Sequence, residues 1–167
     1  MSNVNVRSER PTDLAAIRAV TTAAFKDLPY SNQTEADIID ALRIAGALTI
    51  SLVATRDHDI VGHIAFSPVT IAEDAGNWYG LGPVSVRPDQ QARGFGQGLV
   101  RAGLQRLAAL NAAGCVVLGD PRYYQRFGFE SDAALCYEGA PPSHFQRLVF
   151  CGPSPRGRVV YHAAFGS

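Results

Sequence analysis

A glycine-rich segment in the middle of the chain has the residue types and spacing of an anion-binding turn. An apolar run at 84–86 is followed by Gln91-Ala92-Arg93-Gly94-Phe95-Gly96-Gln97-Gly98 and then by an amphipathic stretch with a helical period. The first N–H groups of a helix have no intrahelical partner and lie at the positive end of its dipole, and glycines let the backbone approach an anion closely. The segment therefore predicts a phosphate-binding turn, although its glycine spacing alone equally fits a tight strand-to-helix connection.

The charge distribution favours the phosphate interpretation. The chain has 167 residues with 15 basic and 15 acidic side chains, and this neutrality argues against a general binder of nucleic acid or membrane surfaces. Residues 87–126 nevertheless carry six basic and two acidic side chains, whereas residues 1–86 carry six and ten. We expect one local anion site in an otherwise neutral protein.

Two other nucleotide-binding motifs fit poorly. In the dinucleotide fingerprint G-x-G-x-x-G, the third glycine would fall at Leu99, and the glycines would follow the strand directly. A Walker-type loop requires Gly-Lys-Ser/Thr, but the only lysine of the chain is Lys26. A nucleotide-dependent oxidoreductase is therefore a distant alternative.

Hydrophobic periodicity predicts the elements that position this turn. We expect one domain over 1–167 with a mixed sheet, in the order β-α-α-β-β-β-α-β-α-β-β. A turn is predicted at 73–77, and Thr34 is predicted to cap the second helix. The apolar run 115–118 after a long helix indicates a crossover between parallel strands. The predicted strands are 4–8, 49–56, 60–71, 78–87, 115–118, 145–150 and 159–164, and the predicted helices are 11–25, 34–46, 96–111 and 122–127.

Two motifs in this order resemble the GNAT superfamily of N-acetyltransferases. Gln91-x-x-Gly94-x-Gly96 is similar to the acetyl-CoA-binding motif of that family, with Val84-x-Val86-x-Pro88 upstream. The later Tyr123-Tyr124-x-x-Phe127-Gly128-Phe129 is similar to a second family motif. Together with Gly119-Asp120-Pro121 and the run 160–165, it resembles a small bacterial subgroup of the superfamily.

The resemblance implies a fold, a co-substrate and site residues. The fourth and fifth strands would splay apart to admit acetyl-CoA, and Gly80, Gly82 and Pro83 supply the irregularity that this opening requires. The backbone of the glycine-rich turn would hold the pyrophosphate, the fourth strand would pair with the pantetheine arm, and its Val84 N–H would polarise the thioester carbonyl. Tyr124 would protonate the departing thiolate. The implied cofactor-binding residues are Val84, Val86, Gln91, Ala92, Arg93, Gly94, Phe95, Gly96 and Gln97.

The chain departs from the family pattern at two places. No carboxylate occurs at 81–86 on the fourth strand, where many relatives place a glutamate base. Glu35 and His63 are candidate bases by position, with structural roles favoured for both, and bulk water could also accept the proton. Val117 stands where the superfamily often has a cofactor-contacting asparagine, and Asp120 is expected to cap the short helix.

The resulting hypothesis is an acetyl-CoA-dependent transfer to a primary amine of a small molecule or peptide, with a non-catalytic acyl-CoA-binding or sensing module as the alternative. The acceptor is expected beside residues 27–35, with the 138–157 loop as a second wall. No metal is expected, because the three cysteines and four histidines lack ligand spacing. A cytoplasmic location, no nucleic-acid or membrane partner and a possible homodimer complete the expectations.

Overall fold

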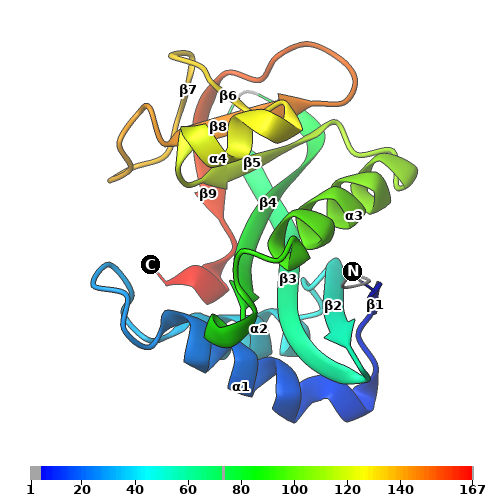
Figure 1. The fold of residues 1–167 in the computed structure, drawn as a ribbon. Coiled ribbons are helices and arrows are strands. Elements are labelled where there is room, and N and C mark those ends of the chain that lie inside the picture. Colours follow the sequence, from blue (N-terminus) through cyan, green and yellow to red (C-terminus); the bar gives the residue numbers. More distant parts are fainter. Residues whose placement is uncertain (1–4, 73, 167) are drawn as a thin grey trace. The chain divides into compact units, whose positions relative to one another are not determined.

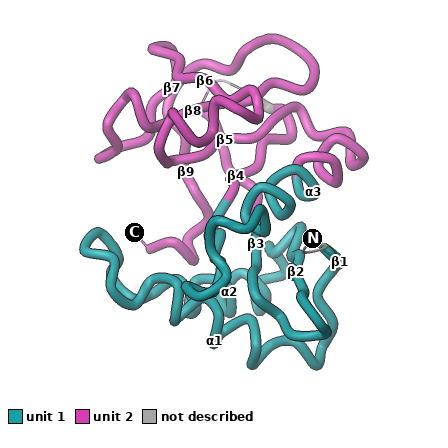
Figure 2. The backbone as a smooth tube through the Cα atoms, in the orientation of Figure 1, with its two compact units in different colours: residues 1–66, 82–103 teal, residues 67–81, 104–167 magenta. Residues whose placement is uncertain are grey.

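The computed structural model describes residues 5–72 and 74–166 and divides into two compact units (Figure 2). The first unit comprises Met1–Phe66 and Gly82–Gly103, and the second comprises Ser67–Leu81 and Leu104–Ser167. Each unit is assembled from two separate stretches of chain, because the strands β3 (Asp59–Ile71) and β4 (Asp74–Val86) and the helix α3 (Phe95–Ala109) contribute to both.

The first unit is built around an antiparallel sheet. The strands β1 (Asn5–Ser8), β2 (Ile50–Arg56) and the first part of β3 are paired in that order. The helices α1 (Leu14–Phe25) and α2 (Glu35–Ile44) connect β1 to β2, and the 3₁₀ turn η2 (Pro88–Gln90) leads from β4 to α3 (Figure 1). Asp57 and His58 form the tight β2–β3 turn with positive φ angles of 51° and 72°.

Alternation along β3 determines which helix covers each face of this sheet. Ala65 packs in one cluster with Val53 of β2, Ile17 of α1 and Ile39 of α2. The opposite face carries Gly62, which has no side chain, and Phe66, which has a flat ring, and both leave room for α3. A Cβ on Gly62 would lie 3.0 Å from Leu99 Cδ1 of α3, and a Cβ on Gly103 of α3 would clash with the Phe66 ring. The α3 helix therefore packs closely against the backbone of β3.

The second unit contains the remaining strands. The parallel β4–β5 pair, with β5 at Gly114–Leu118, continues through β8 (Phe145–Val149) to β6 (Glu130–Ser131), while β9 (Gly157–Tyr161) pairs with the end of β3 and with β7 (Leu135–Cys136). The short helix α4 (Pro121–Tyr124) and the 3₁₀ turn η3 (Gln125–Phe127) follow β5, and η4 (Ala163–Phe165) follows β9. Buried Trp78, Val116 and Phe145 form the centre of its core.

The mixed α/β fold and the parallel crossover through α3 are confirmed, whereas several local predictions are wrong. Asp74–Asn77 is the start of β4, not a turn, and the two-residue strands β6 and β7 were not predicted. Thr34 is the N-cap residue of α2, but its side chain makes no capping hydrogen bond. Val4 and Glu73, the predicted first residues of a strand and a turn, lie outside the described residues.

None of the helices within residues 5–72 and 74–166 combines the length and apolar character that crossing a bilayer requires.

Candidate active site

The glycine-rich turn has the backbone conformation of an anion-binding loop. Ala92 and Gly94 have φ angles of 63° and 89°, so left-handed residues alternate with ordinary ones directly before α3. Such an alternation turns successive N–H groups toward one side. The α3 helix begins at Phe95, and its first N–H groups have no intrahelical acceptor by helix geometry. Gly98 N–H already donates to Gly94 O at 3.0 Å, so the exposed donors end before it.

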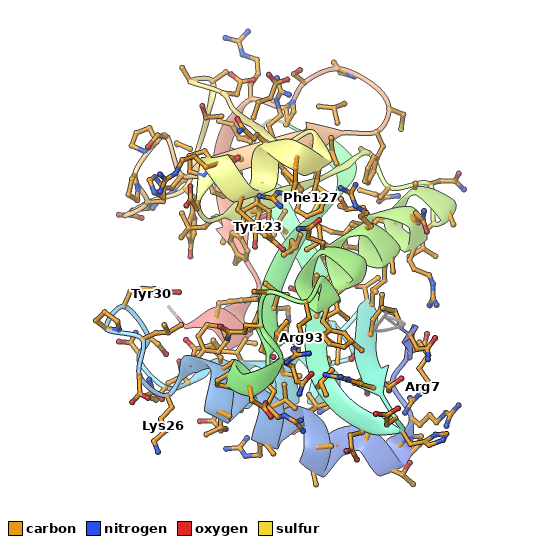
Figure 3. All side chains as sticks on the ribbon, in the orientation of Figure 1. Arg7, Lys26, Tyr30, Arg93, Tyr123 and Phe127 are labelled. Carbon is orange, nitrogen blue, oxygen red and sulfur yellow. The ribbon has the colours of Figure 1, made fainter. Side chains whose placement is uncertain are left out.

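Side chains around this turn leave its open side accessible. Gln91, Ala92, Arg93 and Gly94 are exposed, whereas Phe95 is fully buried and anchors the start of α3. Arg93 projects from the loop before α3 (Figure 3) and takes part in none of the ion pairs found within the described residues. The turn can therefore present backbone donors and one guanidinium to a phosphate group.

Upstream contacts fix the entry to the turn. Arg87 N–H donates to Val61 O at 2.7 Å, and the Gln91 amide donates to Val86 O at 3.1 Å. Arg56 Nη1 donates to Gln90 Oε1 at 2.7 Å, which ties η2 to the end of β2. These bonds hold the upstream side of the turn, so the backbone that enters it is organised before any ligand binds.

The β4 strand is regular only in part. Its register with β5 consists of three pairs and ends at Gly80 and Val116. Gly82 follows with a φ of 132°, and the Gly82–Pro83 peptide is cis. Ser85 is buried, with its Oγ 3.4 Å from Thr21 Oγ of α1. Because side chains alternate along a strand, Val84 and Val86 point to the face opposite Ser85.

Tyr124 is held in a cluster of aromatic rings. Its side chain is 8% exposed, and its ring makes edge contacts with Tyr123 and Phe129 at centroid distances of 5.0 and 5.8 Å. Figure 3 shows Tyr123 and Phe127 on the segment that carries Tyr124, and the Phe127 ring lies 6.1 Å from it. Contact on several sides fixes the direction of the Tyr124 ring.

The loop before α4 adds a further constraint on this ring. Asp120 Oδ1 accepts the Arg122 N–H at 2.9 Å, which confirms the predicted helix cap. A Cβ on Gly119 would lie 2.4 Å from Tyr124 Cε2, so the ring rests on the Gly119 backbone. Gln146, buried on β8, donates to Gly119 O at 3.1 Å. Sequence reasoning missed Gln146, because nothing local connects it with a loop 27 residues earlier.

The two candidate bases are both engaged in contacts within the first unit. His63 is fully buried, its Nε2 lies 2.8 Å from Ser51 Oγ, and burial lowers its pKa to about 4. The Glu35 carboxylate accepts the Ser31 hydroxyl at 2.7 Å, at the start of α2. These contacts favour structural roles for both residues, and the complete burial of His63 prevents contact with a substrate.

The remaining predicted features concern metals and thiols. Within the described ranges, no group of three or more His, Cys, Asp or Glu side chains could hold a metal ion. Cys115 is fully buried on β5, and burial raises the pKa of its thiol well above the usual value. Cys115 therefore stays protonated and does not act as a nucleophile.

Comparison with known proteins gives consistent matches. The model of the acetyltransferase (GNAT) domain family matches residues 48–131. The uncharacterized N-acetyltransferase YhbS of Escherichia coli is 37% identical over 126 residues, covering 75% of this chain and 72% of YhbS. The uncharacterized N-acetyltransferase YjhQ of the same species is 33% identical over 123 residues, covering 71% of this chain and 65% of YjhQ.

Two solved structures resemble this one along nearly its whole length. A GNAT family acetyltransferase from Brucella melitensis, determined in complex with acetyl-CoA, is 51% identical, with a TM-score of 0.87 and 99% of both chains covered. YhbS from E. coli in complex with CoA is 32% identical, with a TM-score of 0.89 and coverage of 100% of this chain and 94% of YhbS.

Proposed function

The chain belongs to the GNAT family of N-acetyltransferases, and on that premise we propose that it transfers the acetyl group of acetyl-CoA to a primary amine by direct attack. The observation that carries the proposal is the glycine-rich turn, whose left-handed Ala92 and Gly94 precede the free N-terminal donors of α3. The 51% identical Brucella structure, which contains acetyl-CoA, supports the same co-substrate. The Tyr123-Tyr124 motif and the match to YhbS support assignment to the small bacterial subgroup.

The turn would bind the pyrophosphate of CoA. Backbone N–H groups from Gln91 to Gln97 would donate to its oxygens, and Arg93 would add a charge-assisted hydrogen bond. Arg93 supplies positive charge within the turn itself, which favours a multiply charged anion at this place. Because backbone groups and not titrating side chains provide most donors, we expect acetyl-CoA binding to depend weakly on pH near neutrality.

The β4 strand would bind the pantetheine arm and polarise the thioester. Its pairing with β5 ends at Gly80, so the backbone beyond it is available for an extended ligand, with Val84 and Val86 as the pairing residues. The Val84 N–H would donate to the thioester carbonyl. That hydrogen bond strengthens as negative charge develops on the oxygen, and such transition-state stabilisation is worth a few kcal/mol.

The chemical step is a direct displacement. The nitrogen lone pair of the neutral amine attacks the carbonyl carbon and forms the C–N bond, and the electron pair of the breaking C–S bond leaves with sulfur. Tyr124 would donate its hydroxyl proton to that sulfur, and the amine would lose its proton to bulk water, because His63 and Glu35 are engaged in structural contacts. A covalent acetyl-cysteine at Cys115 does not enter the scheme, because that thiol is buried and protonated.

A non-catalytic acyl-CoA sensor is the second candidate, favoured by the absence of a carboxylate at 81–86 on β4. Thermal unfolding with acetyl-CoA, CoA or NADH tests the ligand class: a ligand at 100 times its Kd adds about 2.7 kcal/mol of stability. We expect acetyl-CoA and CoA to raise the melting temperature and NADH to leave it unchanged. Stabilisation by NADH alone would refute the proposal, and thiol release that depends on an added amine separates an enzyme from a sensor.

A further inference from the structure

A cavity of about 320 Å³ in the second unit has no role in the site described above. Three aromatic rings, one carboxylate and one guanidinium line it: Tyr137, Tyr161, Phe165, Glu138 and Arg158. We propose, on the premise of the amine acetyltransferase function, that this cavity binds the acceptor and that the acceptor is a primary amine carried on an aromatic group. Of the segments predicted to line the acceptor site, the 138–157 loop contributes Glu138.

The aromatic walls make the cavity suitable for one flat apolar group. Tyr161 lies between the other two rings, with its centroid 4.8 Å from that of Tyr137 and 5.2 Å from that of Phe165. The interplanar angles of these two pairs are 48° and 68°, so the rings are tilted or edge-to-face relative to one another. A ligand ring could make the same kinds of contact with them. The volume lies at the lower end of the range of small-molecule sites, which suits a single ring with a short chain.

The charges of the lining disfavour an acceptor with several ammonium groups. Glu138 and Arg158 form an ion pair with each other and are both largely exposed, at 76% and 57% of their side-chain area. Because the Glu138 carboxylate is already paired with Arg158, the aromatic ring faces are the groups of the lining that attract an ammonium group. A polyamine or basic peptide would bring several positive charges to a lining that has one carboxylate. The ammonium form is the one attracted, and it loses its proton to water before attack.

The Tyr161 ring connects the cavity with the reacting end of β4. A Cβ on Gly80 would lie 2.6 Å from Tyr161 Cε2, so the ring is packed directly on the Gly80 backbone. Gly80 is also the last β4 residue in register with β5. The cavity wall therefore touches the residue at which the β4–β5 pairing ends, a few positions along the chain before Val84, the residue proposed to polarise the thioester.

The environment of Tyr161 keeps this wall of the cavity uncharged. Burial raises the pKa of Tyr161 well above its usual value, and the nearby Cys115, Tyr137 and Tyr124 act in the same direction. Tyr161 thus remains a protonated phenol at any physiological pH.

The test compares two amines on the same preparation of the full chain. Thiol release from acetyl-CoA is measured with phenethylamine and with n-propylamine, and the ratio of their kcat/KM values is independent of the fraction of folded protein. We expect a ratio of about tenfold or more, because one buried ring adds apolar contact area that propylamine lacks. In Phe165→Ala the ratio should fall severalfold. Phe150→Ala, a matched loss of a ring outside the cavity, should keep the wild-type ratio.

A binding measurement separates this proposal from the proposed function. Calorimetric titration of each amine into the CoA-bound protein requires no turnover, and we expect tighter binding of phenethylamine than of propylamine, a preference that Phe165→Ala reduces severalfold. Turnover of both amines with equal kcat/KM would overturn the cavity proposal and leave the acetyltransferase function intact. Tighter binding of phenethylamine without any thiol release would uphold the cavity and refute the function. Equal binding of both amines, or a preference that Phe165→Ala leaves unchanged, would overturn the cavity assignment.

Discussion

Replacing Tyr124 by phenylalanine removes one oxygen from the proposed site and leaves the rest of it in place. The ring contacts with Tyr123, Phe127 and Phe129, at centroid distances of 5.0, 6.1 and 5.8 Å, and the packing on Gly119 do not involve the hydroxyl. We therefore expect the free energy of unfolding to change by at most about 1 kcal/mol, the net contribution of an ordinary hydrogen bond.

The effect on turnover should be much larger. A positioned general acid contributes about 10²–10⁴-fold, so kcat of Tyr124→Phe should fall by at least about 10², which corresponds to roughly 2.7 kcal/mol in the activation barrier. The KM for acetyl-CoA should stay nearly constant, because the proposed pyrophosphate and pantetheine contacts come from other residues. The assay is thiol release at saturating acetyl-CoA and amine, repeated across a full pH profile.

Tyr123→Phe is the matched control, since it removes the same atom from the neighbouring ring of the same short helix. It should retain wild-type kcat at every pH. The reasoning fails if Tyr124→Phe keeps kcat within about twofold of the wild type over the whole profile, or if both variants lose activity equally, because a general acid is worth far more than that.

Three further predictions follow from backbone geometry and burial. Gly94 and Gly139 have φ angles of 89° and 84°, and a Cβ on either would meet open space, so Gly94→Ala and Gly139→Ala impose the same left-handed strain. Both variants should lose about 1–2 kcal/mol of stability. Only Gly94→Ala should raise the KM for acetyl-CoA. Gly119→Ala should lower kcat more than acetyl-CoA affinity in the same assay, because the new Cβ would displace the Tyr124 ring. Burial lowers the pKa of His63 from 6.5 to about 4, so between these pH values the unfolded chain binds a proton that the folded chain does not. Urea unfolding at several pH values should therefore show the free energy of unfolding falling by up to roughly 3 kcal/mol as the pH is lowered from 6.5 to 4. His63→Gln should flatten this dependence, and an unchanged pH profile in that variant would contradict the assignment.

The glycine-rich turn was predictable because its requirements are local. A strand followed by closely spaced glycines and an amphipathic helix specifies both the left-handed Gly94 and the position of the helix N-terminus. The left-handed Ala92 carried no such signal, since alanine has no preference for that conformation. The cap at Asp120 was predicted correctly for the same local reason, with Pro121 at the first helical position.

Predictions failed where pairing between distant segments decides the structure. Asp74, Gly76 and Asn77 are turn-forming residues, yet they lie in β4, because ladder hydrogen bonds with neighbouring strands outweigh local preference. The strands β6 and β7 have two residues each, too few for any periodicity to show. The cavity beside Tyr161 combines side chains from β9, from η4 and from the loop after β7, so only the folded chain reveals it.

The most direct test of the central claim measures both products of the reaction in one sample. The protein is incubated with acetyl-CoA and phenethylamine, and free thiol and N-acetylated amine are quantified together. The proposed direct transfer predicts that free thiol and N-acetylated amine accumulate in equal amounts. When the amine is omitted, thiol release should be no faster than in a protein-free control. Stabilisation of the protein by acetyl-CoA, with no amine-dependent thiol release across a panel of aromatic and aliphatic primary amines, would contradict the enzyme account and favour an acyl-CoA sensor.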